Sequence, residues 1–168
     1  QAEYQIEENT KMKRFTYYQS PMGQMTLQAN DDGLLGAWFE VHTTQPEELG
    51  TRDDSFPVLL QTIRELSQYY AGEKVEFSVP IAAKGTAFQL SVWQALLAIP
   101  YGETWSYQQI ADFIGNPKAV RAVGLANGKN PVSVIVPCHR VIGKNGKLTG
   151  YAGGLERKQR LLVIEGRK

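Results

Sequence analysis

Cysteine and histidine are scarce in this chain of 168 residues, which holds one Cys (Cys138) and two His (His42 and His139). A single cysteine excludes an internal disulfide and favours a reducing compartment, so we expect the protein to be cytoplasmic. The same scarcity argues against a structural zinc site, because one thiolate and two imidazoles would have to converge from distant segments. The sequence therefore predicts no bound metal.

Long apolar runs are also missing. No stretch approaches the roughly 20 apolar residues that a membrane-spanning helix needs, and the first residues lack the apolar core of a signal peptide. Apolar residues make up 42% of the chain and charged residues 21%, which is ordinary for a globular protein of one domain or two small ones. Residues 1–11 show no periodicity, and we expect them to be a disordered leader or a remnant of expression.

Net charge is small, at +1, but the two halves of the chain differ in sign. Residues 1–82 carry 6 Lys and Arg against 13 Asp and Glu, a net charge of −7. Residues 83–168 carry 12 against 4, a net charge of +8. This asymmetry favours a polyanionic partner for the second half, and the alternative is a basic surface that is merely solvated.

Residues 12–82 have the pattern of an α/β domain that begins with a three-stranded antiparallel meander. Its strands are expected at 14–19, 24–29 and 34–41. Ser20–Gly23 and Asp31–Gly33 supply the turns between them.

A helix is expected next, over residues 57–70, because apolar residues recur there on one helical face. That face comprises Leu59, Ile63, Leu66 and Tyr70. Alternating apolar residues over 75–79 then predict a short strand. Residues 80–85 are expected to be a linker, across which the charge changes sign.

Residues 86–168 are expected to be mainly helical. Thr86–Gln89 and Ser106–Gln109 both have the spacing of a capping box, which begins a helix. The first helix is expected to point a set of apolar residues inward and to end at Pro100. That set comprises Phe88, Val92, Trp93, Leu96 and Leu97. Asn116 is expected to cap a further helix, with Pro117 at its first position.

The second and third of these helices, joined by a tight turn, predict a helix-turn-helix. The third helix has a face of small residues, which would let its backbone approach DNA closely. These residues are Ala119, Ala122, Val123 and Ala126. Its other face carries Lys118, Arg121, Leu125 and Lys129. An Asn-Gly turn flanked by lysines, Lys144–Lys147, predicts a basic wing, and a last helix over about 154–165 closes the domain.

The sequence Pro137-Cys138-His139-Arg140 follows an apolar run, residues 134–136, which is expected to be a buried strand. A lone cysteine is usually a small buried hydrophobe, but here two potential cations adjoin the sulfur and favour the nucleophilic thiolate. We therefore expect the pKa of Cys138 to lie below its ordinary value of about 8.5. Glu165 is a candidate to orient His139 in a Cys/His/acid relay, which would reach the sulfur through a water.

Together these motifs resemble the O6-alkylguanine-DNA alkyltransferases, the methylated-DNA–protein-cysteine methyltransferase family. NPVSVIVPCHRVIG (130–143) is similar to the active-site signature of that family. SYQQIA, GNPKAVRAVG, YAGG and LLVIEG follow the family order and spacing over residues 86–166. The resemblance implies a ribonuclease H-like α/β N-terminal domain, a three-stranded antiparallel sheet with helices. It also implies a mainly α, winged helix-turn-helix C-terminal domain, and a monomer that acts on double-stranded DNA without a cofactor.

The resemblance also implies roles for individual residues. Cys138 would accept the alkyl group, Asn130 would brace the turn around it, and His139 and Glu165 would activate it through a water. Tyr107 would press on the phosphate of the target nucleotide, force it outward and line the pocket.

Arg121 would then occupy the gap left in the duplex. The other DNA contacts implied are Lys118, Ala119, Ala126, Lys144 and Asn145. The pocket for the flipped guanine would comprise Val141, Gly150, Tyr151, Ala152 and Gly153. Some relatives have a serine at the position of Ala152, so an oxygen contact there would have to come from the backbone.

The implied reaction is direct reversal of damage at O6-alkylguanine, with O4-alkylthymine as a second substrate. A base must leave the stack before its substituent can be reached. The thioether product has no evident route back to thiolate, so each molecule would act once, as a suicide enzyme. The alternatives are a lesion-binding alkyltransferase-like protein, a cysteine hydrolase and a winged-helix transcription factor. The first lacks the acceptor cysteine, the second usually takes its histidine from a distant segment, and the third does not need the PCHR motif.

Overall fold

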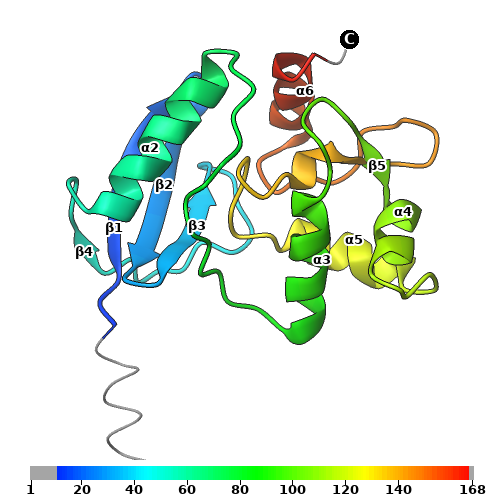
Figure 1. Cartoon of the computed structure of the whole chain (residues 1–168), viewed down its shortest axis with the longest axis horizontal. Helices are drawn as coiled ribbons and strands as arrows, with labels where there is room; N and C mark the ends of the chain where they lie inside the picture. The colour runs from blue at the N-terminus through cyan, green and yellow to red at the C-terminus, as the bar shows by residue number, and fades with distance from the viewer. Residues whose placement is uncertain (1–10, 167–168) are drawn as a thin grey trace, which may run out of the picture.

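The computed structural model describes residues 11–166, so most of the segment expected to be a leader lies outside it. An α/β lobe and a mainly helical lobe lie side by side (Figure 1). Within residues 11–166 no helix combines the length and the apolar character needed to cross a membrane.

The N-terminal lobe is built on β1 (Arg14–Ser20), β2 (Gly23–Asn30) and β3 (Gly33–Trp38), which pair as the predicted antiparallel meander. A strand that the sequence pattern did not indicate, β4 (Thr51–Arg52), adds in parallel to β1 and gives the order β3-β2-β1-β4. The turn before β3 requires glycine: Gly33 has φ +146°, and an added Cβ would lie 2.5 Å from the carbonyl oxygen of Pro80.

Helix α2 (Pro57–Tyr70) packs on this sheet, as predicted, with Leu59 and Leu66 fully buried. Tyr69 is also buried, with 1% of its surface exposed, whereas Tyr70 is only half-buried. The strand predicted over 75–79 is wrong. That segment has no sheet partner, because the Glu65 carboxylate on α2 accepts hydrogen bonds from the backbone N–H groups of Ser78 and Val79, at 3.0 and 3.2 Å.

The C-terminal lobe begins with two capped helices, α3 (Ala87–Leu97) and α4 (Tyr107–Phe113). Both predicted capping boxes are confirmed, with reciprocal hydrogen bonds between Thr86 and Gln89 and between Ser106 and Gln109. The prediction that Leu97 points inward is wrong: 44% of it is exposed, because it lies in the last turn of α3 away from the core.

Helix α5 (Val120–Gly128) packs against α4 and completes the helix-turn-helix. It begins three residues later than predicted, because residues 116–119 form a turn closed by the Ala119 N–H and the Asn116 carbonyl oxygen, 3.0 Å apart. The predicted Lys144–Lys147 turn is present, with the Gly143 N–H donating to the Lys147 carbonyl oxygen at 2.8 Å.

No strand returns from that turn within the described part of the chain, so the wing is a loop. Instead β6 (Val141–Ile142) pairs in parallel with β5 (Trp105–Ser106). The last helix, α6 (Leu155–Ile164), follows the loop and agrees with the predicted range.

The two lobes share a continuous hydrophobic core. They are also joined by backbone hydrogen bonds between β3 and residues 131–133, and we call this junction the seam. The Ala37 N–H of β3 donates to the Pro131 carbonyl oxygen at 2.8 Å, and the Ser133 N–H donates back to the Ala37 carbonyl oxygen at 3.0 Å. The apolar run 134–136 is buried as predicted but is not a strand. After Ser133 the chain leaves the edge of β3 in a turn, in which Val134 has φ +72°.

Candidate active site

Asn130 holds the segment that carries Cys138. Its side-chain oxygen accepts from the Val132 N–H at 3.0 Å, and its side-chain nitrogen donates to the Val136 carbonyl oxygen at 2.9 Å. The positive φ of Val134 lies between these two anchors, and such a backbone costs about 1–3 kcal/mol, so surrounding contacts must hold it. The amide therefore fixes the turn that ends in the 3₁₀ helix η1 (Cys138–Arg140).

The Cys138 thiol is enclosed, with 3% of the residue exposed. Burial raises the pKa of Cys138, and the hydrogen bond from Asn130 and the nearby Lys158 ammonium only partly oppose that rise. The prediction of a lowered pKa is therefore wrong for this arrangement. The physical reason is that the expected cations, His139 and Arg140, both direct their side-chain nitrogens to the Glu165 carboxylate.

His139 and Glu165 form the core of the predicted relay. The His139 Nε2 and Glu165 Oε2 atoms are 2.6 Å apart, and both residues are buried. Burial, together with the Arg140 and Lys158 charges, lowers the pKa of His139 against the opposing effect of the Glu165 carboxylate, so the imidazole is neutral at pH 7. With its proton on Nε2 toward the carboxylate, the ring keeps Nδ1 as a base, and Nδ1 has no hydrogen-bond partner within residues 11–166.

Glu165 is surrounded by donors. Arg140 donates from Nε to Oε1 at 2.7 Å and from Nη2 to Oε2 at 3.1 Å, and the Tyr69 hydroxyl donates to Oε2 at 2.6 Å. Burial alone would raise the pKa of Glu165, but the hydrogen bonds from His139 and Arg140 outweigh it and lower the pKa to about 2. The carboxylate is therefore ionised at neutral pH and can stabilise an imidazolium.

Tyr107 begins α4, and its hydroxyl lies 2.8 Å from the Thr149 Oγ1 atom. The carbonyl oxygen of the same Thr149 accepts from the Lys158 Nζ at 2.6 Å. An added Cβ at Gly124 of α5 would be 3.9 Å from the Tyr107 ring, so the ring lies against the helix-turn-helix. These contacts join α4, α5 and the loop before α6 around one aromatic side chain.

The predicted pocket residues lie in β6 and in the loop that leads to α6. Val141 follows η1 and is fully buried, Tyr151 and Gly153 are buried, Ala152 is half-buried and Gly150 is exposed. Burial raises the pKa of Tyr151 well above its ordinary value, and the Cys138 sulfur beside it adds to the rise. The loop thus brings a protonated phenol close to the thiol.

The predicted DNA-contacting residues are mostly on the surface. Lys118 and Arg121 are exposed at the start of α5, Ala119 is half-buried, and Lys144 and Asn145 are exposed in the wing. Ala126 is a correction, because it is 3% exposed and its carbonyl oxygen accepts from the Trp93 Nε1 at 2.9 Å. Its side chain faces the core, and the exposed surface of α5 passes through Ala122 and Leu125 instead.

Sequence reasoning missed three residues of the site. Arg140 was read as a cation beside the sulfur, and Tyr69, from the other lobe, carried no local signal. Lys158 is fully buried near Cys138, and its spacing from Glu165 in the sequence could have indicated that it belongs to the site. It precedes Glu165 by two helical turns, so the 3.6-residue period places both on one face of α6.

Comparison with known proteins matches both lobes. Residues 13–83 match the family model described as 6-O-methylguanine DNA methyltransferase, ribonuclease-like domain, and residues 87–167 match its DNA binding domain. The chain is 49% identical over 152 residues to the methylated-DNA–protein-cysteine methyltransferase of Methanosarcina acetivorans. The aligned residues cover 90% of this chain and 97% of that relative. It is 50% identical over 146 residues to that of Mycobacterium tuberculosis, covering 87% and 88%.

Solved structures agree. The O6-methylguanine methyltransferase of Mycobacterium tuberculosis superposes with a TM-score of 0.83 at 48% identity, covering 92% of this chain and 93% of that one. A structure of the same organism's OGT in complex with DNA gives 0.81 at 48% identity, covering 91% of each chain. This chain belongs to the 6-O-methylguanine DNA methyltransferase family.

Proposed function

We propose that this protein repairs DNA by direct reversal, moving the alkyl group of O6-alkylguanine onto the Cys138 sulfur. As a member of its family it is a methylated-DNA–protein-cysteine methyltransferase, and DNA is its partner. The observation that carries the proposed roles is the buried pair of His139 and Glu165 next to Cys138, with the basic Nδ1 atom unused. O4-alkylthymine is proposed as a second substrate. We also propose a monomer that acts in the cytoplasm, where a single thiol stays reduced.

In the proposed reaction the thiol stays protonated until the alkylated base arrives, in keeping with its raised pKa. The neutral His139 then takes the proton through a water, and the Glu165 carboxylate stabilises the imidazolium that forms. The sulfur attacks the alkyl carbon, the bond from carbon to guanine O6 breaks, and its electron pair stays on guanine. Tyr107 or a water returns a proton to the base, and Cys138 is left as a thioether.

DNA recognition is proposed to use α5 and the wing, with Arg121 filling the gap left by the extruded nucleotide. The exposed Lys118, Lys144 and Asn145 support this assignment, because side chains of this kind contact phosphates. Cys138 is almost fully enclosed, so a base stacked in a duplex cannot reach it and must be flipped out first. The loop 150–153 would hold the flipped guanine next to Val141.

The test is to incubate the protein with a duplex that contains O6-methylguanine and to measure intact mass. We expect a gain of one methyl group per chain, and none with Cys138→Ser. Binding without a gain in mass would support a lesion-binding protein instead. A return to the original mass after the base is repaired would support a hydrolase, which regenerates its cysteine. Binding that does not distinguish modified from unmodified DNA would support a transcription factor.

A further inference from the structure

Tyr69 connects the N-terminal lobe to the proposed relay. It lies on α2, it is 1% exposed, and its hydroxyl donates to Glu165 Oε2 at 2.6 Å. His139 Nε2 binds the same carboxylate oxygen at the same distance. With Arg140 Nη2, which donates to it at 3.1 Å, this oxygen receives two donors from the C-terminal lobe and one from the N-terminal lobe.

The phenol is held firmly at this oxygen. Its ring packs edge-on against Tyr101, with centroids 6.3 Å apart, and at a tilt against Phe77, with centroids 5.9 Å apart. Burial, reinforced by the Glu165 charge, raises the pKa of Tyr69 far beyond neutral pH, so the hydroxyl is always protonated and always a donor. A fixed donor of this kind holds the carboxylate in one orientation and competes with the His139 Nε2 proton for the same Oε2 atom.

We infer that Tyr69 is a positioning residue of the alkyl transfer, which orients Glu165 and through it His139. This inference rests on the proposed function. The N-terminal lobe then contributes directly to the activation of Cys138, in addition to packing against the C-terminal lobe.

Tyr69→Phe removes the Tyr69 hydroxyl and leaves the other charged and titratable groups around the relay in place. Glu165 also faces Arg140 from η1 and Tyr101 from the segment after α3. The charge of Lys158 from α6 also lowers the pKa of His139. All of these remain in Tyr69→Phe. The variant therefore changes one hydrogen bond to Glu165 Oε2 and leaves the charges of the relay as they were.

Two effects are expected from Tyr69→Phe. The carboxylate is less well oriented, so the single-turnover rate at its plateau should fall by roughly tenfold, less than the 10²–10⁴-fold effect of a group that itself transfers the proton. The carboxylate also becomes a stronger acceptor for the His139 Nε2 proton, so the acid limb of the rate profile should move to higher pH. A residue that only packs the core would lower stability without moving that limb.

The matched control is Tyr70→Phe, the next residue of the same helix, whose hydroxyl does not contact Glu165. Transfer from free O6-benzylguanine is measured in single turnovers from about pH 5 to about pH 9, the range in which histidine titrates. Wild type and both variants are compared as full chains, with folding checked by circular dichroism. The Tyr69→Phe change is then repeated in a Glu165→Gln background, where it should have no further effect on rate.

The outcomes separate this inference from the proposed function. If wild type does not alkylate Cys138, or if Glu165→Gln leaves its pH profile unaltered, the relay itself fails. If the relay stands and Tyr69→Phe has the same profile as Tyr70→Phe, the inference is overturned. Full additivity of Tyr69→Phe and Glu165→Gln would overturn it as well, because two residues acting through one oxygen must be coupled.

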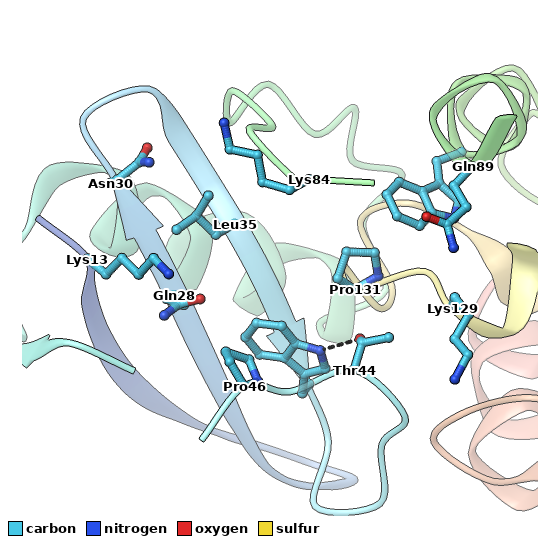
Figure 2. Close-up of a pocket in the computed structure, with 12 residues that line it drawn as sticks. Lys13, Gln28, Asn30, Leu35, Thr44, Pro46, Lys84, Gln89, Lys129 and Pro131 are labelled. Atoms are coloured by element: carbon cyan, nitrogen blue, oxygen red, sulfur yellow. Dashed lines mark hydrogen bonds between the residues drawn. The ribbon is translucent and has the colours of Figure 1, made fainter. Parts of the chain in front are cut away.

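Away from the relay, a cavity of about 340 Å³ lies at the seam between the lobes (Figure 2). Residues of β2 and β3 form one side of it, and residues of α3 and of the segment after α5 form the other. Cys138 and its relay are not part of the lining. Its volume is within the range of small-ligand sites, about 300–1,000 Å³.

Two buried amides in the lining have a fixed orientation. The Gln28 Nε2 donates to the Leu49 carbonyl oxygen at 3.1 Å, which leaves its side-chain oxygen as an acceptor. The Asn30 Oδ1 accepts from the Asp32 N–H at 2.8 Å, which leaves its side-chain nitrogen as a donor. Gln28 is 3% and Asn30 5% exposed, and within residues 11–166 neither remaining polar atom is enclosed without a partner.

The rest of the lining combines apolar side chains with Thr44, Gln89 and three lysines. The indole N–H groups of Trp38 and Trp93 are already bonded to Thr44 and Ala126, so the two rings offer apolar surface to the cavity. Lys13, Lys84 and Lys129 are exposed at the rim, and no acidic residue belongs to the lining.

We infer that this seam cavity binds a nucleoside monophosphate. The two indoles would hold the base, the side-chain oxygen of Gln28 and nitrogen of Asn30 would bond its polar edge, and the lysines would bind the phosphate. A ligand seated there contacts both lobes. The nucleotide could be free in solution or part of an unpaired DNA strand, and the experiment separates these sources.

The probe is dGMP, titrated into the full chain and followed by the indole N–H signals of its tryptophans in NMR spectra. Trp38 and Trp93 should shift in a saturable way, and Trp105, which lies on β5, should not. Lys84→Ala combined with Lys129→Ala should weaken binding at least tenfold, while Lys118→Ala and Lys147→Ala, outside the lining, should not. Deoxyguanosine should bind more weakly than dGMP because it lacks the phosphate.

A single-stranded oligonucleotide is the second probe. Shifts of Trp38 and Trp93 by dGMP alone identify a free nucleotide as the ligand, and shifts by the oligonucleotide at lower concentration identify a DNA strand. Equal weakening by every lysine variant, or shifts that never saturate, would overturn the inference, because a diffuse basic surface behaves in that way.

Discussion

Glu165→Gln removes the charge of the buried carboxylate while nearly keeping the shape of the side chain. The carboxylate accepts two hydrogen bonds from Arg140 and one each from His139 and Tyr69. Glutamine keeps the shape, but it has one acceptor oxygen, and its NH₂ group faces donors. Arg140 then loses its buried partner, and a broken buried pair costs about 3–5 kcal/mol of unfolding free energy.

The pKa of Glu165 gives a second measure of the same loss. It is about 2 in the folded protein and about 4.3 in an unfolded chain, a difference that corresponds to about 3 kcal/mol. Because the folded pKa is the lower one, this stability is present above about pH 4.3 and is lost as the pH falls toward 2. Wild type should therefore lose stability in that window, and Glu165→Gln should start lower and change less. Urea unfolding at several pH values measures both.

The effect on activity follows from the relay. Without the negative charge, the imidazolium of His139 is poorly stabilised, so transfer at pH 7 should slow by about 10²–10⁴-fold. The deficit should persist at about pH 8.5, the ordinary pKa of a thiol, and shrink only well above it, because burial raises the pKa of Cys138. Single-turnover transfer against pH measures this, with Glu156→Gln, exposed on the first turn of α6, as the matched control. A folded Glu165→Gln protein with the wild-type pH profile would refute the reasoning.

Three other substitutions test separate parts of the account. Arg121→Ala should slow repair of a duplex more than reaction with free O6-benzylguanine, since only the duplex requires extrusion, and equal losses would place Arg121 in the pocket or in folding. Tyr107→Phe should slow the chemical step, whereas an unchanged single-turnover rate would exclude its hydroxyl as the proton donor. Gly153→Ala should lower the unfolding free energy by about 1–3 kcal/mol, because the new Cβ would lie 2.8 Å from the Tyr151 ring and 2.9 Å from that of Phe39. A melting temperature equal to that of wild type would contradict this.

Local signals predicted the elements whose structure is set by near neighbours. The capping boxes at Thr86 and Ser106 formed because each needs only a residue three positions away. The meander of β1 to β3 was also predictable, because its turns and its alternation lie within one stretch of sequence. The PCHR motif was predicted from its chemistry, and its backbone forms the 3₁₀ helix η1 after a turn and not the end of a strand.

The errors in strand assignment and in the Cys138 pKa come from contacts that the local pattern of apolar residues does not reveal. The apolar run 134–136 looked like a strand, but the Asn130 side chain and the edge of β3 bend it into a turn. The segment 75–79 alternates like a strand, but the Glu65 carboxylate takes its N–H groups. The pKa of Cys138 was predicted in the wrong direction because the fold buries the thiol, and because Glu165, remote in sequence, takes the neighbouring cations.

The most direct test of the central claim is to follow an isotopically labelled methyl group from O6-methylguanine in duplex DNA into the protein. After complete reaction, proteolysis and mass spectrometry should place one labelled methyl group per chain on the peptide that contains Cys138, and a second addition of substrate should transfer no more. Label on another residue, or more than one methyl group transferred per chain, would contradict the account.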